Sequence, residues 1–177
     1  MGCGAGRLTH ALQALDHPVV AVDQSPEMLA HVHGATTVCT DIEALALGRR
    51  FAGVLLASHL VNVASDTRRL AFLRTCRAHV APARAVLIQR LPPDWASTAG
   101  QTTERDGVRG TLRDVVEADG LVSAVMEYSA GERHWSHAFT VRTLDDAAFN
   151  QALVAAGLRR ECWLDPRCCW ALARPRP

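Results

Sequence analysis

The sequence predicts an α/β fold, a three-layer sandwich in which helices cover both faces of a mostly parallel sheet. Over the first 91 residues, short apolar segments alternate with segments of helical periodicity. This alternation is typical of parallel strands joined by crossover helices. Beyond residue 91, apolar and polar residues alternate with a period of two, which predicts a small antiparallel meander inserted at that point.

The composition favours one globular domain: the chain has 177 residues, of which 49% are hydrophobic and 21% charged. The net charge is +1 and the charges are interspersed, so we expect neither a nucleic-acid nor a membrane surface. The six cysteines lack zinc-ligand spacing, which predicts no metal site and a reducing, cytoplasmic location. Several cysteines stand in apolar runs and are expected to be buried.

The first half contains the predicted parallel sheet. Leu8, Leu12 and Leu15 recur at helical spacing, and Ser25-Pro26 is a typical helix start with a capping serine. The expected helices span residues 7–15, 25–34 and 66–79, and the expected strands span residues 19–22, 36–39, 51–57 and 85–89.

The second half is predicted to begin with a loop at residues 95–106. Turn signals at Asp119-Gly120 and Gly131-Glu132 join the three meander strands. Thr143-Leu144-Asp145-Asp146 predicts a capping box at the start of a helix that ends at Gly157. The expected meander strands span residues 110–117, 121–128 and 135–141, and two short strands follow at 159–164 and 168–173.

A glycine-rich loop, Gly2-Cys3-Gly4-Ala5-Gly6, runs into the first helix, and the next strand ends on Asp23. In nucleotide-binding folds, glycines let the backbone approach the ligand, and an acid at this place accepts hydrogen bonds from ribose hydroxyls. The dinucleotide fingerprint needs a small residue where this chain has Arg7. A nicotinamide-dependent oxidoreductase is therefore disfavoured.

With these residues the sequence resembles the class I S-adenosylmethionine-dependent methyltransferases, in particular the compact bacterial type that acts on small molecules. The resemblance covers essentially the whole chain and is specific from residue 2 to about residue 91. It implies a Rossmann-like sandwich that moves a methyl group from S-adenosylmethionine to an oxygen, nitrogen or carbon of a small molecule. One domain is expected, with a cofactor-binding part (1–91), a substrate-covering insert after the family's fifth strand (92–142) and a C-terminal helix with two strands (143–177).

The resemblance also implies a role for individual residues. The glycine loop cradles the amino acid portion and ribose, Asp23 binds the ribose hydroxyls, and Asp41 accepts from the adenine amino group. The implied cofactor-binding residues are Gly2, Cys3, Gly4, Gly6, Asp23, Gln24, Met28, Asp41, Ile42, Ala57 and Ser58.

The substrate side is less determined by the sequence. His59 follows the strand that borders the methyl donor, so it is a candidate base or substrate ligand, with a loop or capping role as the alternative. Asn62 is a candidate acceptor-orienting group or a structural hydrogen-bonding residue. On the meander, His137 is expected to be buried and hydrogen-bonded. Tyr128, Met126 and Trp135 are expected in its core, with an apolar substrate pocket as the alternative.

Three departures from the family pattern stand out. Phe51-Ala52-Gly53 replaces a usual Phe-Asp, and Pro82-Ala83-Arg84 replaces a usual Pro-Gly-Gly turn. The family's first strand and the helix before it have no counterpart ahead of Gly2, for which a misplaced start codon or a shortened chain is the simplest hypothesis. Without that strand, we expect unpaired backbone on its neighbours.

The same departure supports a first alternative function, a degenerate cofactor-binding protein without turnover. A nucleotide-dependent oxidoreductase is the second alternative. The sequence does not indicate an oligomeric state.

Overall fold

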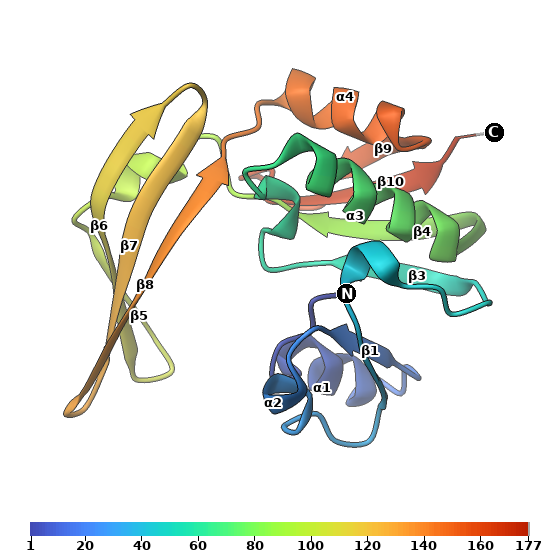
Figure 1. Cartoon of the computed structure of the whole chain (residues 1–177), viewed down its shortest axis with the longest axis horizontal. Helices are drawn as coiled ribbons and strands as arrows, with labels where there is room; N and C mark the ends of the chain where they lie inside the picture. Colours follow the sequence, from blue (N-terminus) through green and yellow to red (C-terminus); the bar gives the residue numbers. More distant parts are fainter. Residues whose placement is uncertain (177) are drawn as a thin grey trace.

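The structure, a computed structural model, describes residues 1–176 and arranges its strands in three sheets (Figure 1). The helices are α1 (Arg7–Gln13), α2 (Pro26–Leu29), α3 (Asp66–His79) and α4 (Asp146–Ala155), with short 3-10 turns η1 (Ile42–Ala44), η2 (Leu60–Asn62) and η3 (Trp95–Thr98). The strands are β1 (Val20–Asp23), β2 (Thr36–Cys39), β3 (Phe51–Leu56), β4 (Val80–Gln89), β5 (Thr102–Arg105), β6 (Val108–Ala118), β7 (Leu121–Ala130), β8 (Arg133–Arg142), β9 (Leu158–Trp163) and β10 (Trp170–Pro175). The end of the predicted C-terminal part, residue 177, lies outside the described residues.

The N-terminal lobe consists of α1, β1, α2 and β2, and its two strands pair in parallel as expected. The Ser25 hydroxyl accepts a hydrogen bond from the Met28 amide at 3.1 Å, which caps α2. α2 ends at Leu29, well before the predicted end at Gly34. The helix is shorter because backbone amides after it donate to carbonyls three residues earlier instead of four. The His31 amide, for example, donates to the Met28 carbonyl.

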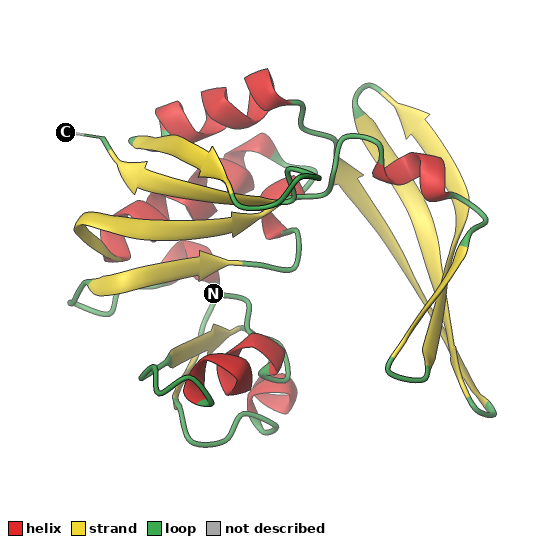
Figure 2. Cartoon of the chain, turned by 180° about the vertical axis from the view of Figure 1, so that it is seen from behind, coloured by secondary structure: helices red, strands yellow, loops and turns green. Residues whose placement is uncertain are grey.

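The main sheet has the order β3-β4-β10-β9, with β3 and β4 parallel and β10 antiparallel to both of its neighbours. Helices α3 and α4 cover one face of this sheet, and Figure 2 shows its strands from the opposite side. Leu56, Val86 and Ala171 point toward the helices and are fully buried, whereas Leu87 and Leu172 on the opposite face are half-buried. The main core therefore lies between the sheet and α3–α4.

The meander is a four-stranded antiparallel sheet with the order β5-β6-β7-β8 (Figure 1). The prediction of a loop at 95–106 was wrong, because η3 and β5 lie within it. β5 forms because Asp106 and Gly107 both take positive φ, 54° and 76°, and reverse the chain as a tight hairpin turn. Trp95, Leu112, Val122 and Ala124 give the meander a small core of its own.

The start of α4 differs from the predicted capping box. Asp145, rather than Thr143, is the cap, and its carboxylate accepts from the Ala148 amide at 2.7 Å. The helix is followed by Gly157 at φ 72°, as expected for a left-handed stop.

Several of the cysteines were expected to be buried, but only Cys76 is buried, while Cys39 and Cys162 are exposed. All six are free thiols. Within residues 1–176, no three His, Cys, Asp or Glu side chains gather as metal ligands. Across the same residues, every helix is too short or too polar to cross a membrane.

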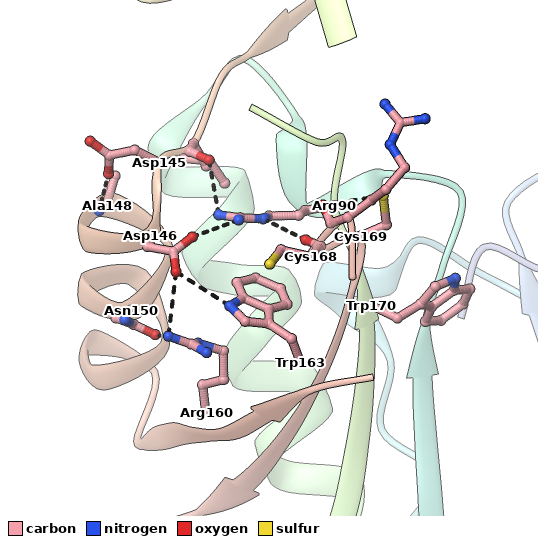
Figure 3. A network of polar contacts seen from close by, with 12 residues as sticks. Arg90, Asp145, Asp146, Ala148, Asn150, Arg160, Trp163, Cys168, Cys169 and Trp170 are labelled. Carbon is pink, nitrogen blue, oxygen red and sulfur yellow. Dashed lines mark hydrogen bonds and ion pairs between the residues drawn. The ribbon is translucent and has the colours of Figure 1, made fainter. Parts of the chain in front are cut away.

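A fully buried Arg90 joins the end of β4 to the C-terminal elements (Figure 3). Its guanidinium donates to the Cys168 and Leu144 carbonyls at 3.0 and 3.1 Å, and to the Asp146 carboxylate at 2.6 Å. The same group lies over the Trp163 ring, 4.1 Å from its centre. A buried charge is stable only when its donors are satisfied in this way.

A cleft of about 600 Å³ separates β1 from β3. Each of these strands has one paired edge among the described residues, since β1 pairs with β2 and β3 with β4. The segment Met1–Cys3 lies at the end of the cleft: its first nitrogen donates to the Leu55 carbonyl, and the Cys3 amide donates to the Val22 carbonyl, both at 2.9 Å. These three residues contact both β1 and β3. The gap between the facing edges of the two strands is therefore about wide enough for one strand at this end of the cleft.

An added strand in this cleft should stabilise the fold. We expect that extending the chain ahead of Met1 by about four uncharged, β-branched residues, the length of β1, raises the free energy of unfolding by about 1–3 kcal/mol. The gain arises because backbone groups on both edges acquire partners and apolar surface is buried. Urea unfolding measures it, with an equally long Asp/Lys segment as the control. Equal midpoints for the two extended chains would contradict the expectation.

Candidate functional site

A second cavity, of about 650 Å³, lies where the N-terminal lobe, the carboxyl end of β3 and the meander meet. The carboxyl ends of parallel strands are the usual ligand-binding edge of such sheets. The cavity is lined by Gly2, Asp23, Gln24, Thr40, Ile42, Glu43, Ser58, His59, Leu60, Val63, Arg68, Phe72, Leu91, Trp95, Met126, Tyr128, His137, Phe139 and Val141.

Asp23 stands at the end of β1 with its carboxylate held on both sides. One oxygen accepts from the Gly4 amide at 2.7 Å, and the other accepts from the Ser25 amide at 3.1 Å. Each carboxylate oxygen has two lone pairs, so these bonds fix its orientation and leave capacity for two further donors. A pair of neighbouring hydroxyls is the ligand chemistry that matches this arrangement.

The glycine loop has the backbone that its sequence requires. Gly2, Gly4 and Gly6 have φ of 62°, 53° and 89°, a region that favours glycine. A Cβ at Gly2 would overlap the Leu60 side chain, so that position has a second reason to be glycine. A Cβ at Gly4 would meet no atom within 4 Å, and the loop therefore leaves open space beside Asp23.

The structure brings together about half of the residues expected to bind the cofactor. Gly2, Asp23, Gln24, Ile42 and Ser58 line the cavity, and the others do not. Those others are distributed as follows: Cys3 and Ala57 line the β1–β3 cleft, Met28 is 47% exposed, Gly4 and Gly6 shape the loop, and Asp41 is exposed with no hydrogen bond to its side chain.

His59 lies in a strained turn directly after β3. Both Ser58 and His59 have positive φ, 54° and 59°, although neither is glycine. Such backbone persists where surrounding contacts hold it, and it is common at functional sites. The Nδ1 atom of His59 is buried without a hydrogen-bond partner. Burial lowers the pKa of His59, with the backbone of Arg90 acting in the opposite direction, and the net shift favours the neutral imidazole.

Asn62 makes structural hydrogen bonds, the second of the two roles that the sequence left open for it. It is fully buried, its amide nitrogen donates to the Arg142 carbonyl at 2.9 Å, and its oxygen accepts from the Leu91 amide at 2.8 Å. Both ends of the side chain are thus bound to the backbone, and the residue does not line the cavity.

The meander supplies the opposite wall of the cavity. His137 was expected to be buried and hydrogen-bonded, but it is exposed, because β8 is the outer strand of the meander and this part of it is uncovered. Its ring stacks on Phe139 at 5.9 Å. Trp135 is 45% exposed and stacks on Tyr128 at 5.4 Å, so it is not part of the core either. Met126 and Tyr128 line the cavity, which agrees with the alternative of an apolar pocket.

Sequence reasoning missed several residues that line the cavity. Trp95 is 7% exposed, its indole nitrogen is unpartnered, and its ring packs 6.0 Å from Phe139. Glu43 and Arg68 form an ion pair of 2.7 Å at the rim. No local pattern signalled them, because their shared position arises from tertiary packing of segments far apart in the sequence.

Comparison with known proteins identifies the fold. Residues 1–83 match the family model described as a methyltransferase domain. A solved S-adenosylmethionine-dependent methyltransferase from Clostridium acetobutylicum superposes with a TM-score of 0.82 at 17% identity, over 99% of this chain and 82% of that one. The fold is that of the class I methyltransferases.

Two further solved structures share this methyltransferase fold. An amino pentose methyltransferase from Micromonospora echinaspora, solved with S-adenosylmethionine bound, gives a TM-score of 0.77 at 20% identity, over 98% of this chain and 80% of that one. A sugar N-methyltransferase from a Streptoalloteichus species gives 0.76 at 19% identity, over 99% and 78%. No curated protein matches the chain.

The half-buried His59 makes stability depend on pH. Because its pKa is lower in the folded than in the unfolded state, the unfolded chain takes up the proton first as the pH falls. Stability is therefore full above the unfolded-state value of about 6.5 and decreases below it. Urea unfolding between about pH 7.5 and 5.5 should show a smaller loss of stability for His59→Gln than for the wild type. Equal losses would contradict the burial of His59.

Proposed function

We propose that the chain binds S-adenosylmethionine in the 650 Å³ cavity and transfers its methyl group to a small-molecule acceptor. The observation that carries the proposal is the oriented Asp23 carboxylate beside the open glycine loop. Asp23 would hold the two ribose hydroxyls. Gln24 and Ile42, which line the same end, would lie along the ribose and adenine.

The acceptor side of the cavity is formed by His59 and the meander wall. When bound, S-adenosylmethionine would supply a methyl group that is bonded to a positively charged sulfur. The acceptor attacks the methyl carbon, and the sulfur leaves as part of S-adenosylhomocysteine. The chain's main task is alignment, and a base is needed only for an acceptor that must lose a proton. His59 is suited to receive that proton because burial keeps its imidazole neutral.

Nitrogen acceptors are the first to test. Two of the structurally similar proteins are described as an amino pentose methyltransferase and a sugar N-methyltransferase. Incubation with methyl-labelled S-adenosylmethionine and a panel of amino sugars, with the matching hydroxy sugars as controls, should label the amines. The loss of label in His59→Gln, with cofactor affinity retained, would assign the base. Label on hydroxyls alone would redirect the proposal to O-methylation.

Two other functions stay open to test. A degenerate protein that binds the cofactor without turnover is suggested by the cleft between β1 and β3, and is opposed by the oriented Asp23. A nucleotide-dependent oxidoreductase is opposed by Arg7 at the place of a small residue. Calorimetry with S-adenosylhomocysteine and with the oxidised nicotinamide cofactor tests the oxidoreductase alternative, and the labelling assay distinguishes turnover from cofactor binding alone. The proposed location is the cytoplasm.

Asp23→Ala should weaken the affinity for S-adenosylhomocysteine by about 10- to 150-fold. Hydrogen bonds to a charged group contribute about 1.5–3 kcal/mol, and every 1.4 kcal/mol is a factor of ten. Calorimetry measures the dissociation constant, and Glu27→Ala, an exposed acid four residues away on the same lobe, is the control. An unchanged affinity in Asp23→Ala would refute the assignment of the ribose site.

A further inference from the structure

The turn that carries His59 needs support from outside its own segment. Ser58 and His59 adopt left-handed backbone in succession, a combination that residues with a Cβ rarely take. The turn also leaves the His59 Nδ1 atom buried without a partner. Contacts with other elements must therefore hold this conformation against relaxation.

The contacts from outside the turn come from Gln89, the last residue of β4, and from Leu91 just after it. The Gln89 side-chain oxygen accepts from the Ser58 amide at 2.9 Å. Two residues further, the Leu91 amide donates to the Asn62 side chain at 2.8 Å, and the Asn62 amide donates to the His59 carbonyl at 2.8 Å. The turn is thus bound before, at and after His59.

Arg90 lies between these two contact residues and makes their position rigid. Its guanidinium is enclosed by carbonyls, a carboxylate and an aromatic face, and its amide donates to the Cys169 carbonyl at 2.8 Å (Figure 3). Because backbone and side chain are both fixed, the end of β4 has little freedom to follow a movement of the turn. The backbone of Arg90 also faces the His59 ring.

We propose that Gln89, Arg90 and Asn62 form a clamp of positioning residues that holds His59 at the cavity. The role rests on the proposed function, in which His59 faces the acceptor. Asn62 acts through its bonds to the two backbones, and Gln89 acts through the Ser58 amide. Arg90 acts by anchoring the strand end to the C-terminal elements.

Loss of the clamp should change the pKa of the His59 ring. Loosening it should let the turn relax and the ring reach water, which raises the His59 pKa toward its ordinary value. Arg7 on α1 also lowers the pKa of His59, and Asp23, the Glu43–Arg68 pair and His137 line the same cavity; the variants leave all of these residues unchanged. A change in the titration with these groups intact therefore reports the clamp.

The experiment is an NMR titration of the histidine rings in the full chain, with His59→Gln used to assign the His59 signal. Gln89→Met keeps the length of the side chain and removes the acceptor for the Ser58 amide. We expect a raised His59 pKa in Gln89→Met and in Arg90→Lys. We also expect faster hydrogen exchange at the Ser58 amide in Gln89→Met, by about tenfold, the factor for one lost hydrogen bond.

Ser25→Ala is the matched control, because it removes the side-chain cap of α2 in the N-terminal lobe and leaves the turn and every contact of Arg90 intact. The proposal is overturned if the His59 titration is the same in Gln89→Met as in the wild type, or if Ser25→Ala shifts it equally. Gln89→Met keeps the experiment decisive if Arg90→Lys does not fold. Binding of S-adenosylhomocysteine, measured in parallel, tests the proposed function separately, since the wild-type titration does not depend on cofactor.

Discussion

Asn62 connects three parts of the chain that are far apart in the sequence, and the site depends on this connection. Its side chain bridges the end of β4 and the end of β8, and its backbone binds the His59 carbonyl. The isolated bridge between Val63 and Val141 continues the same junction. A buried amide with both ends satisfied fixes geometry more strictly than apolar contact does, since its bonds have preferred directions. The meander and the turn after β3 are therefore held as two walls of one cavity.

Local rules were sufficient for most elements and for the position of Asp23, on which the proposed cofactor end of the site depends. Ser25-Pro26, the alternation along β7 and β8, and Gly157 each act within a few residues, so the sequence predicts them directly. Asp23 was found because a strand end followed by an acid is also a local pattern. The hairpin turn at Asp106-Gly107 was locally encoded as well, but polar side chains on both faces of β5 hid the strand.

The roles and burial of several site residues could not be predicted from the sequence, because they depend on tertiary contacts. Asn62 has the chemistry of a substrate ligand, and only the positions of the Leu91 and Arg142 backbones show that its amide is already used. His137 alternates correctly with the apolar residues of β8, but β8 is an outer strand and its face is open to the cavity. Trp95 lies in a polar segment and becomes buried only because the meander folds over it.

The proposed cofactor end and the proposed acceptor end of the cavity belong to bodies with separate cores. Asp23 ends β1 and Gln24 follows it, in a lobe that is held by a small cluster around Ala21, Leu29 and Val32. His59 comes after β3, a strand of the main sheet, which has its own core. Between β1 and β3 lies the cleft, so few contacts other than those of Met1–Cys3 connect the two bodies there. A ligand that spans both ends would have to fix their relative position, and that ordering reduces its net affinity. A strand that filled the cleft would fix the relative position of the two bodies before the ligand binds. The ligand would then bind more tightly, because it would no longer have to order the two bodies itself. Completing the sheet and binding the ligand are therefore energetically coupled.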